Sequence, residues 1–571
     1  MIENLFSSKV LFQILTVLFK NEDKTLSTSQ IIKLTKKNQA NVLRELNKLN
    51  NWQIVKKSKV NNQNFYSINK SFDYYDSLKG LFINNQDKSK KYFLLNEESS
   101  VALLSLDYLY KAFSNDTAVK YKILNQSSSV VAQHKDNYGW FYFEKEKINK
   151  SAAESLEKLL SDTSFIDDVI YKNTINQGQK LFKIFKELKN KKFKTTKQQA
   201  VSLIKEFISI VDIQVGMNYI AVLDLENHTY SNYLKKYLDK KTKGSKLQTN
   251  IVMEKLLTPV NLSQTQLLRI ELLKLVLKNN GEKELKTIHK NWEWLNYGYR
   301  GPALSLSYFK QLYSELTDKK SGELKKELND LLSYEQKIKK EKQKLFNSLK
   351  IDLKHQNFIK ALSLLSFLKV YRKDCLFLIV YLTYKIINNF NKSIKQENLF
   401  YLTIAEAIKL IQGNLEITKQ ELVKRERNSV YIANENKILF DEEADKFIDN
   451  NVQRNDEVNQ GVNFLDGSTA CLGETGDWVN GEVKIINRPS DLEKMNQGDI
   501  LISVGTTPEL LPAMKKASAI VTDHGGITCH AAIVSRELNI PCLIGTKYAT
   551  KIFKDGDNVV VCPRHGYIKF Q

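Results

Sequence analysis

Cysteine is scarce in this chain, with five in 571 residues and no CxxC pair among them. The five are Cys375, Cys471, Cys529, Cys542 and Cys562. Their scatter excludes the disulfide framework of a small secreted module and the ligand spacing of a structural zinc site. We therefore expect no metal site and a protein of the reducing cytoplasm.

Long apolar runs and targeting signals are missing as well. The most apolar stretch, Cys375–Tyr384, is ten residues long, whereas a membrane-spanning helix needs about 20. The first residues, Met1-Ile-Glu-Asn, lack the basic and then apolar layout of a signal peptide. These absences predict a cytoplasmic protein that does not enter a membrane.

Glycine and proline are rare between residues 90 and 450, and no GxxxxGK[ST] phosphate loop occurs. Apolar residues recur there every three or four positions, which predicts helices. The clearest examples are Ser151–Leu160, Gln198–Val211, Ser263–Leu277 and Phe358–Phe390. Gly139–Phe143 is the exception and predicts a strand, whereas the charged segment Lys319–Lys354 predicts one long helix. This part of the chain is therefore expected to be a large, mostly α-helical domain.

The first 70 residues predict a small basic module. Residues 7–20, 30–34 and 42–49 show helical apolar spacing, and 54–60 and 64–69 read as a two-stranded hairpin. This pattern resembles the ArsR/MarR-type winged helix-turn-helix domains. The stretch carries 12 Lys and Arg against 4 Asp and Glu, which favours an anionic partner.

If that partner is DNA, the third helix is expected to enter the major groove and the hairpin to contact phosphates. The predicted DNA-binding residues are Lys37, Asn38, Gln39, Asn41, Arg44, Lys56, Lys57 and Lys59. The alternative is a protein-interaction module with a solvated basic face.

The most specific pattern surrounds His530, which follows Gly525, Gly526 and Thr528. The glycines allow tight backbone geometry, and Thr528 is the expected cap of a helix that ends near residues 539–541. The unpaired N–H groups at such a helix start favour a negative charge. An imidazole at this place is suited to accept a phosphoryl group and pass it on. We therefore predict His530 as the phosphoacceptor, with Thr528, Gly525 and Gly526 shaping its site.

This segment resembles the phosphohistidine, or swivelling mobile, domain of the phosphoenolpyruvate-utilising enzymes, such as phosphoenolpyruvate synthase and rifampicin phosphotransferase. The resemblance extends over Gly481–Ile486, Gly498–Ile502, Thr506–Pro508 and Ala517–Thr522. It implies that His530 carries phosphate between two distant sites, with no stably bound cofactor. The donor is then ATP or phosphoenolpyruvate, with Mg, at a partner site.

The resemblance also implies an ATP-grasp module that loads the histidine and an acceptor site. No mixed α/β segment with glycine-rich turns precedes residue 455, and a barrel of about 250 residues does not fit after His530. We therefore expect a stand-alone form that meets a separate ATP-grasp or phosphoryl-donor protein.

An aromatic island interrupts the helical middle at residues 292–308. It resembles the YGxRGP-type element of rifampicin phosphotransferase-like proteins. Its residues Arg300, Tyr297, Tyr299 and Trp294 are candidates for binding a small anionic or aromatic ligand. Equally, the arginine could pin neighbouring helices.

Together these patterns predict a multidomain α+β protein. Its parts are a winged helix-turn-helix at 1–85, a helical domain at 90–450 and a C-terminal swivelling β/β/α phosphohistidine domain at 458–571. Two functions stay open: a phosphotransferase component that carries phosphate on His530, and a transcriptional regulator that uses an idle phosphohistidine-like scaffold as a metabolite or phosphorylation sensor. A homodimer is compatible with either.

Overall fold

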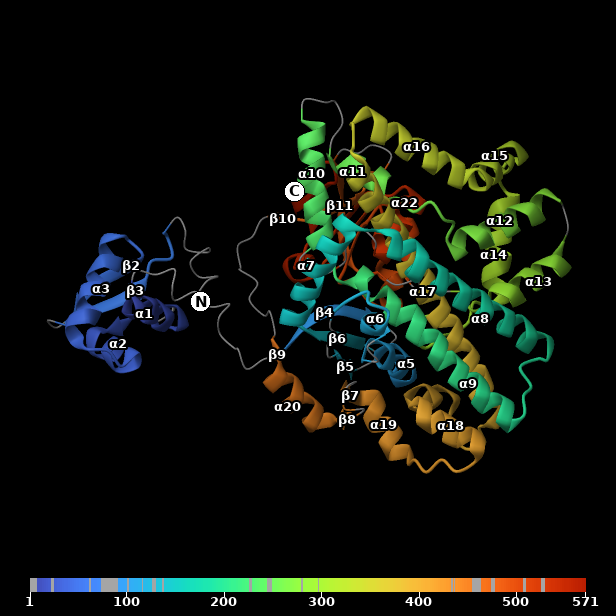
Figure 1. Ribbon diagram of the computed structural model, residues 1–571, viewed down its shortest axis with the longest axis horizontal. Coiled ribbons are helices and arrows are strands. Elements are labelled where there is room, and N and C mark those ends of the chain that lie inside the picture. The colour runs from blue at the N-terminus through green and yellow to red at the C-terminus, as the bar shows by residue number, and fades with distance from the viewer. Residues whose placement is uncertain are drawn as a thin grey trace. The chain divides into compact units, whose positions relative to one another are not determined.

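The computed structural model forms two compact units, residues 1–90 and 91–571 (Figure 1). It describes the whole chain except residues 1–7, 22–24, 61–62, 73–90, 100–101, 115–116, 126–129, 136–137, 225–227, 244–248, 279–280, 296, 433–434, 436, 454–463, 474–477, 507–509 and 525–528.

The described residues of the first unit form three helices and a small antiparallel sheet. Its elements are α1 (Lys9–Lys20), β1 (Leu26–Ser27), α2 (Thr28–Thr35), α3 (Gln39–Asn51), β2 (Val55–Val60) and β3 (Gln63–Ile68). The sheet has the order β1-β3-β2. Each helix begins at a polar cap, as where the Asn38 side chain accepts a hydrogen bond from the Asn41 backbone N–H at 2.9 Å. Ile14, Ile31 and Leu46 are fully buried in a core of their own.

A six-stranded sheet forms part of the second unit. Its strands are β4 (Tyr92–Ser99), β5 (Val130–Lys135), β6 (Tyr138–Glu144), β7 (Asn428–Ile432), β8 (Lys437–Phe440) and β9 (Val452–Gln453), in the order β8-β7-β5-β6-β4-β9. The strand predicted at Gly139–Phe143 is confirmed as β6. The other strands were not predicted, and β5 pairs with β7 through residues as distant as Val131 and Ile432.

Helices make up most of the remainder up to residue 451. They are α5 (Leu103–Ser114), α6 (Thr117–Lys120), α7 (Lys145–Ser161), α8 (Lys172–Asn190), α9 (Lys197–Val211), α10 (Thr229–Thr242), α11 (Thr249–Leu257), α12 (Gln264–Leu277), α13 (Glu282–Trp292), α14 (Leu306–Thr317), α15 (Ser321–Leu332), α16 (Tyr334–Ser348), α17 (Leu353–Phe390), α18 (Ile404–Gln412), α19 (Lys419–Arg427) and α20 (Asp441–Asn451). The single helix predicted over Lys319–Lys354 is wrong, because α15 and α16 are separated at Ser333.

Helix α17 is the central element of this region. Its 38 residues correspond to a length of about 57 Å at 1.5 Å per residue. The Asp352 side chain caps its start by accepting a hydrogen bond from the His355 N–H at 3.1 Å. Buried residues occur on all its sides, as expected for a helix that other helices surround.

The C-terminal part is an eight-stranded mixed sheet with the order β10-β17-β16-β12-β13-β14-β15-β11. Its elements are β10 (Phe464–Asp466), β11 (Ser468–Cys471), β12 (Val479–Ile485), β13 (Ile500–Ser503), α21 (Leu511–Lys516), β14 (Ala519–Thr522), α22 (His530–Leu538), β15 (Cys542–Ile544), α23 (Ala549–Ile552), β16 (Asn558–Cys562) and β17 (Tyr567–Phe570). Strands β12, β13, β14 and β15 are parallel. Strands β13 and β14 are buried along their full length, as parallel strands covered on both faces are.

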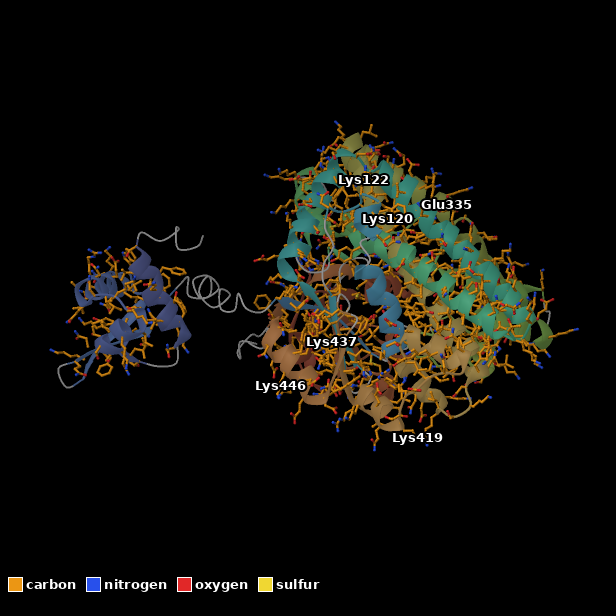
Figure 2. The ribbon with its side chains drawn as sticks, turned by 60° about the horizontal axis from the view of Figure 1, so that its bottom comes forward. Lys120, Lys122, Glu335, Lys419, Lys437 and Lys446 are labelled. Carbon is orange, nitrogen blue, oxygen red and sulfur yellow. The ribbon has the colours of Figure 1, made fainter. Side chains whose placement is uncertain are left out.

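Exposed lysines of the second unit are spread over separate elements. Figure 2 labels Lys120 at the end of α6, Lys419 at the start of α19, Lys437 in β8 and Lys446 in α20, all of them exposed. In the described part of the chain no helix is long and apolar enough to cross a membrane.

Candidate functional site

His530 lies at the carboxyl edge of the parallel strands. It is the first residue of α22, which follows β14, whereas Thr506 follows the neighbouring strand β13. Loops at this edge of adjacent parallel strands converge on one place, where ligands usually bind. The fold therefore brings together two residues that are 24 positions apart.

The imidazole of His530 is oriented by one hydrogen bond. Its Nδ1 lies 2.9 Å from the Thr506 hydroxyl, and Thr506 is buried. When Nδ1 carries the proton and donates it to this hydroxyl, Nε2 has a lone pair available for attack. The contact occupies Nδ1 and leaves Nε2 as the nitrogen that can attack when Nδ1 carries the proton.

The electrostatic surroundings keep His530 uncharged. Burial, and then the charge of Lys373, lower the pKa of His530 to about 3. A neutral imidazole is the form that can attack phosphorus. At neutral pH the ring is therefore ready to react without losing a proton first.

Three basic residues of α17 lie close together, and two of them act on the start of α22: Lys373 on His530 and Lys369 on Cys529. The three are Lys369, Arg372 and Lys373, spaced by three and four positions and therefore on one face of the helix. Burial, together with the other two cations and partly offset by Cys529 and Asp224, lowers the pKa of Lys369 to about 8. Burial also lowers the pKa of Arg372 to about 10.

The Arg372 guanidinium lacks acceptors for two of its nitrogens. Nε and Nη1 are buried and have no hydrogen-bond partner in the described part of the protein. A buried guanidinium with unpaired N–H groups is costly unless an acceptor joins it. The charges of Arg372 and Lys373 both act on Lys369, so this face of α17 is electropositive.

Asp523 anchors the end of β14, seven positions before His530. Its carboxylate accepts hydrogen bonds from the Thr546 hydroxyl at 3.0 Å and the Thr550 N–H at 3.2 Å. Burial raises the pKa of Asp523. The predicted residues Gly525, Gly526 and Thr528 lie just beyond it, outside the described residues, and α22 itself begins at His530 with Cys529 as its cap residue.

The aromatic island is part of the core. Trp294, Tyr297 and Tyr299 are buried, and Arg300 Nη2 lies 3.8 Å from Glu426 Oε1. The contact of Arg300 with Glu426, a residue of α19, is of the kind expected if the arginine holds neighbouring helices together. One link to the histidine site exists, because Lys373 Nζ lies 5.6 Å from the ring centre of Tyr299.

The predicted DNA-binding residues lie on the surface of the first unit. Asn38, Gln39, Arg44, Lys56, Lys57 and Lys59 are exposed, whereas Lys37 and Asn41 are half-buried. The Asn38 oxygen is already used to cap α3. The Arg44 side chain is 62% exposed, and its Nη2 pairs with the buried Glu45 at 3.1 Å.

Sequence reasoning did not assign three basic residues and one hydroxyl of this site. The signal for the basic residues was three cations within five positions of an otherwise apolar helix. Thr506 stood inside a motif that resembles the phosphohistidine domain, but its contact with His530 depends on the pairing of β13 with β14.

Comparison with known proteins shows which family the C-terminal part resembles. Residues 495–566 match the family model "PEP-utilising enzyme, mobile domain". The chain is similar to a probable phosphoenolpyruvate synthase of Archaeoglobus fulgidus, with 52% identity over 97 residues, 17% of this chain and 13% of that protein. It is also similar to the phosphoenolpyruvate synthases of Pyrococcus furiosus, 50% identical over 97 residues (17% of this chain, 12% of that protein), and Escherichia coli, 50% identical over 86 residues (15% and 11%). The C-terminal part is thus a mobile domain of the phosphoenolpyruvate-utilising type, and the chain spans only a small fraction of the length of these relatives.

Proposed function

We propose that the second unit is a phosphoryl carrier. The observation that carries the proposal is an uncharged, oriented imidazole at a helix start that faces the cations of α17. In the loading step, the lone pair of His530 Nε2 forms a bond to phosphorus while the bond from phosphorus to the leaving oxygen of the donor breaks. In the second step an acceptor oxygen attacks the same phosphorus and frees Nε2.

The donor and acceptor belong to the proposal as well. ATP or phosphoenolpyruvate, with Mg, is the donor, bound by a separate ATP-grasp or phosphoryl-donor protein. Lys369, Arg372 and Lys373 would then compensate the charge of the phosphoryl group on Nε2.

Intact-mass analysis tests the carrier function. The full chain, incubated with cell extract and either ATP or phosphoenolpyruvate, should gain one phosphoryl group that acid removes. We expect no adduct in His530→Gln and an unchanged adduct in His565→Gln, because His565 is an exposed histidine of the same domain. An adduct that persists in His530→Gln would place the phosphate elsewhere.

A second function is favoured by the first unit, for which we propose DNA binding by a winged helix. Support comes from its element order, in which α2 and α3 are followed by the β2–β3 hairpin, and from the exposed cations on α3 and β2. Phosphorylation of His530 would then control the DNA binding of a transcriptional regulator. The alternative is a regulator whose histidine is never phosphorylated, with the scaffold acting as a sensor.

Fluorescence anisotropy with a mixed-sequence DNA duplex tests this second function. Affinity should fall as salt rises, with a slope near −0.9 per neutralised phosphate. Changing Lys56, Lys57 and Lys59 to Ser should reduce the slope by up to about three, at roughly one per phosphate contact. Arg44→Ala should weaken binding, whereas Lys419→Ala in the second unit should have no effect. A DNA affinity that does not change with salt concentration would instead indicate a protein-interaction module.

A further inference from the structure

The second unit contains a partly open cavity of about 270 Å³, apart from the imidazole of His530. Helices α11, α12, α16, α17 and α22 supply most of its wall. Its size is near the lower end of ligand pockets, which hold roughly 300–1,000 Å³. The space therefore suits a small molecule.

Two carboxylates in the wall lack partners. Glu254 of α11 and Asp374 of α17 have no side-chain hydrogen bond or ion pair within the described ranges. Burial raises the pKa of Asp374 to about 8 and also raises the pKa of Glu254. Both side chains are half-buried and border this space, so a hydrogen-bonding or charged group of a ligand can pair with them.

The other charged groups of the wall are one carboxylate and one guanidinium, and the charge of Arg536 acts on Glu254. Glu537, a third carboxylate, accepts a hydrogen bond from the Ser263 hydroxyl at 2.9 Å. Arg536 is the single cation among the described lining residues, and its Nε donates to the Ala470 carbonyl at 3.0 Å. The wall thus has three carboxyl groups for one guanidinium. An ammonium group beside Asp374 would favour the charged form of that acid, which its raised pKa otherwise disfavours at neutral pH.

The uncharged part of the wall narrows the class of ligand. Thr258, Ser366 and Tyr334 contribute hydroxyls, and Gln266 contributes an amide, beside the rings of Phe367 and Tyr371. Such a lining can hydrogen-bond hydroxyl groups of a ligand. A metal ion is a poor match, because no group of three His, Cys, Asp or Glu side chains in the described chain could hold one.

We propose that this cavity binds a small hydroxylated amine, with the ammonium group against Asp374 and Glu254. The site is separate from the imidazole of His530, and its occupation does not require phosphotransfer. The proposal goes beyond the carrier function, because it assigns a ligand class to the interior of the helical region.

Isothermal titration of the full chain tests the proposal with a panel of amine polyols, each paired with an uncharged counterpart. Glucosamine and N-acetylglucosamine form one such pair. At least one amine should bind more than tenfold more tightly than its uncharged counterpart. Asp374→Asn should lower that affinity at least tenfold, while Glu335→Gln, an exposed carboxylate of α16 labelled in Figure 2, should leave it unchanged.

Thermal unfolding separates lost binding from lost folding. Asp374→Asn keeps the shape of the side chain and removes an unpaired acid, so its melting temperature should equal or exceed that of the parent chain. His530→Gln should bind the amine normally, which distinguishes this proposal from the carrier function. The proposal is overturned if no amine outbinds its uncharged counterpart, or if Asp374→Asn binds the amine as the parent does.

Discussion

At the scale of single residues, two features of the surroundings act on the His530 imidazole. The Thr506 hydroxyl holds Nδ1 at 2.9 Å, and burial with Lys373 keeps the ring neutral. The two effects are separable, because one fixes the tautomer and the other the charge.

Replacing Thr506 with Val tests the first effect. Without the hydroxyl, Nδ1 loses its partner and the reactive tautomer is no longer favoured, so the rate of phosphate loading should fall about 10- to 100-fold, the usual cost of losing a group that orients a histidine. Rapid-quench measurement of the phosphorylated fraction gives this rate. Thr506→Ser retains the hydroxyl and should load at near the parent rate; equal rates for Val and Ser would show that the contact does not orient the ring.

The prediction of His530 rests on a motif that is continuous in the sequence. Lys369, Arg372 and Lys373 were not predicted, since they lie roughly 160 positions earlier, an interval of ordinary domain size, on a helix whose sequence indicates a buried core element. Gly525, Gly526 and Thr528 remain predictions. Residue chemistry can thus be read locally, whereas the groups that surround it depend on how the helices pack.

At the scale of elements, α16 and α17 meet around a buried lysine. Lys342 of α16 is 5% exposed, and its Nζ donates to the Ser363 hydroxyl of α17 at 2.6 Å. That hydroxyl donates in turn to the Thr258 carbonyl at 2.9 Å. Burial lowers the pKa of Lys342 from 10.5 to about 7, so the folded protein gives up a proton that the unfolded chain holds.

Lys342→Met should therefore stabilise the fold, by about 1–3 kcal/mol in the free energy of unfolding at pH 7, as replacement of buried charges often does. Between pH 7 and 10.5 the unfolded parent binds more protons than the folded parent, so parental stability rises with pH through this window. The advantage of the variant should then shrink by pH 10.

Urea unfolding at pH 7 and pH 10 measures both quantities. Lys344→Met, at an exposed position of the same helix, should change neither by more than about 0.5 kcal/mol. A variant less stable than the parent at pH 7 would mean that the hydrogen bond to Ser363 outweighs the cost of burying the charge.

The helices of this region were largely predictable, because periodic apolar residues mark a helix within its own sequence. The break at Ser333 was not, since charged residues continue through it on both sides. Strands β5 and β7 were missed for another reason: they are five or six residues long and pair across nearly 300 positions, so nothing local to either strand shows the partnership.

At the scale of the whole molecule, the chain divides into two units with separate cores. Among the described residues, the core of the first unit ends at Ile68, and the cores of the second unit begin at Tyr92 and Phe93. The dense basic charge of the first 70 residues therefore belongs to a unit that packs by itself. The association of the C-terminal sheet with the helices appears only in the packing, where Leu501 and Ala531 share a core with Leu378.

Helix α22 has different neighbours at its two ends. Its first residue, His530, faces the cations of α17, and two turns later Arg536 and Glu537 close one wall of the cavity. Because α22 is one continuous helix of nine residues, a rigid displacement that takes His530 away from Lys373 would also withdraw that wall. If the proposed carrier function holds, departure of the phosphoryl group and opening of the cavity would be one event. A molecule bound in the cavity would oppose the displacement of α22 through its own binding free energy. By the same coupling, phosphorylation of His530 would change the affinity of the cavity for that molecule, and the two effects would be equal in size.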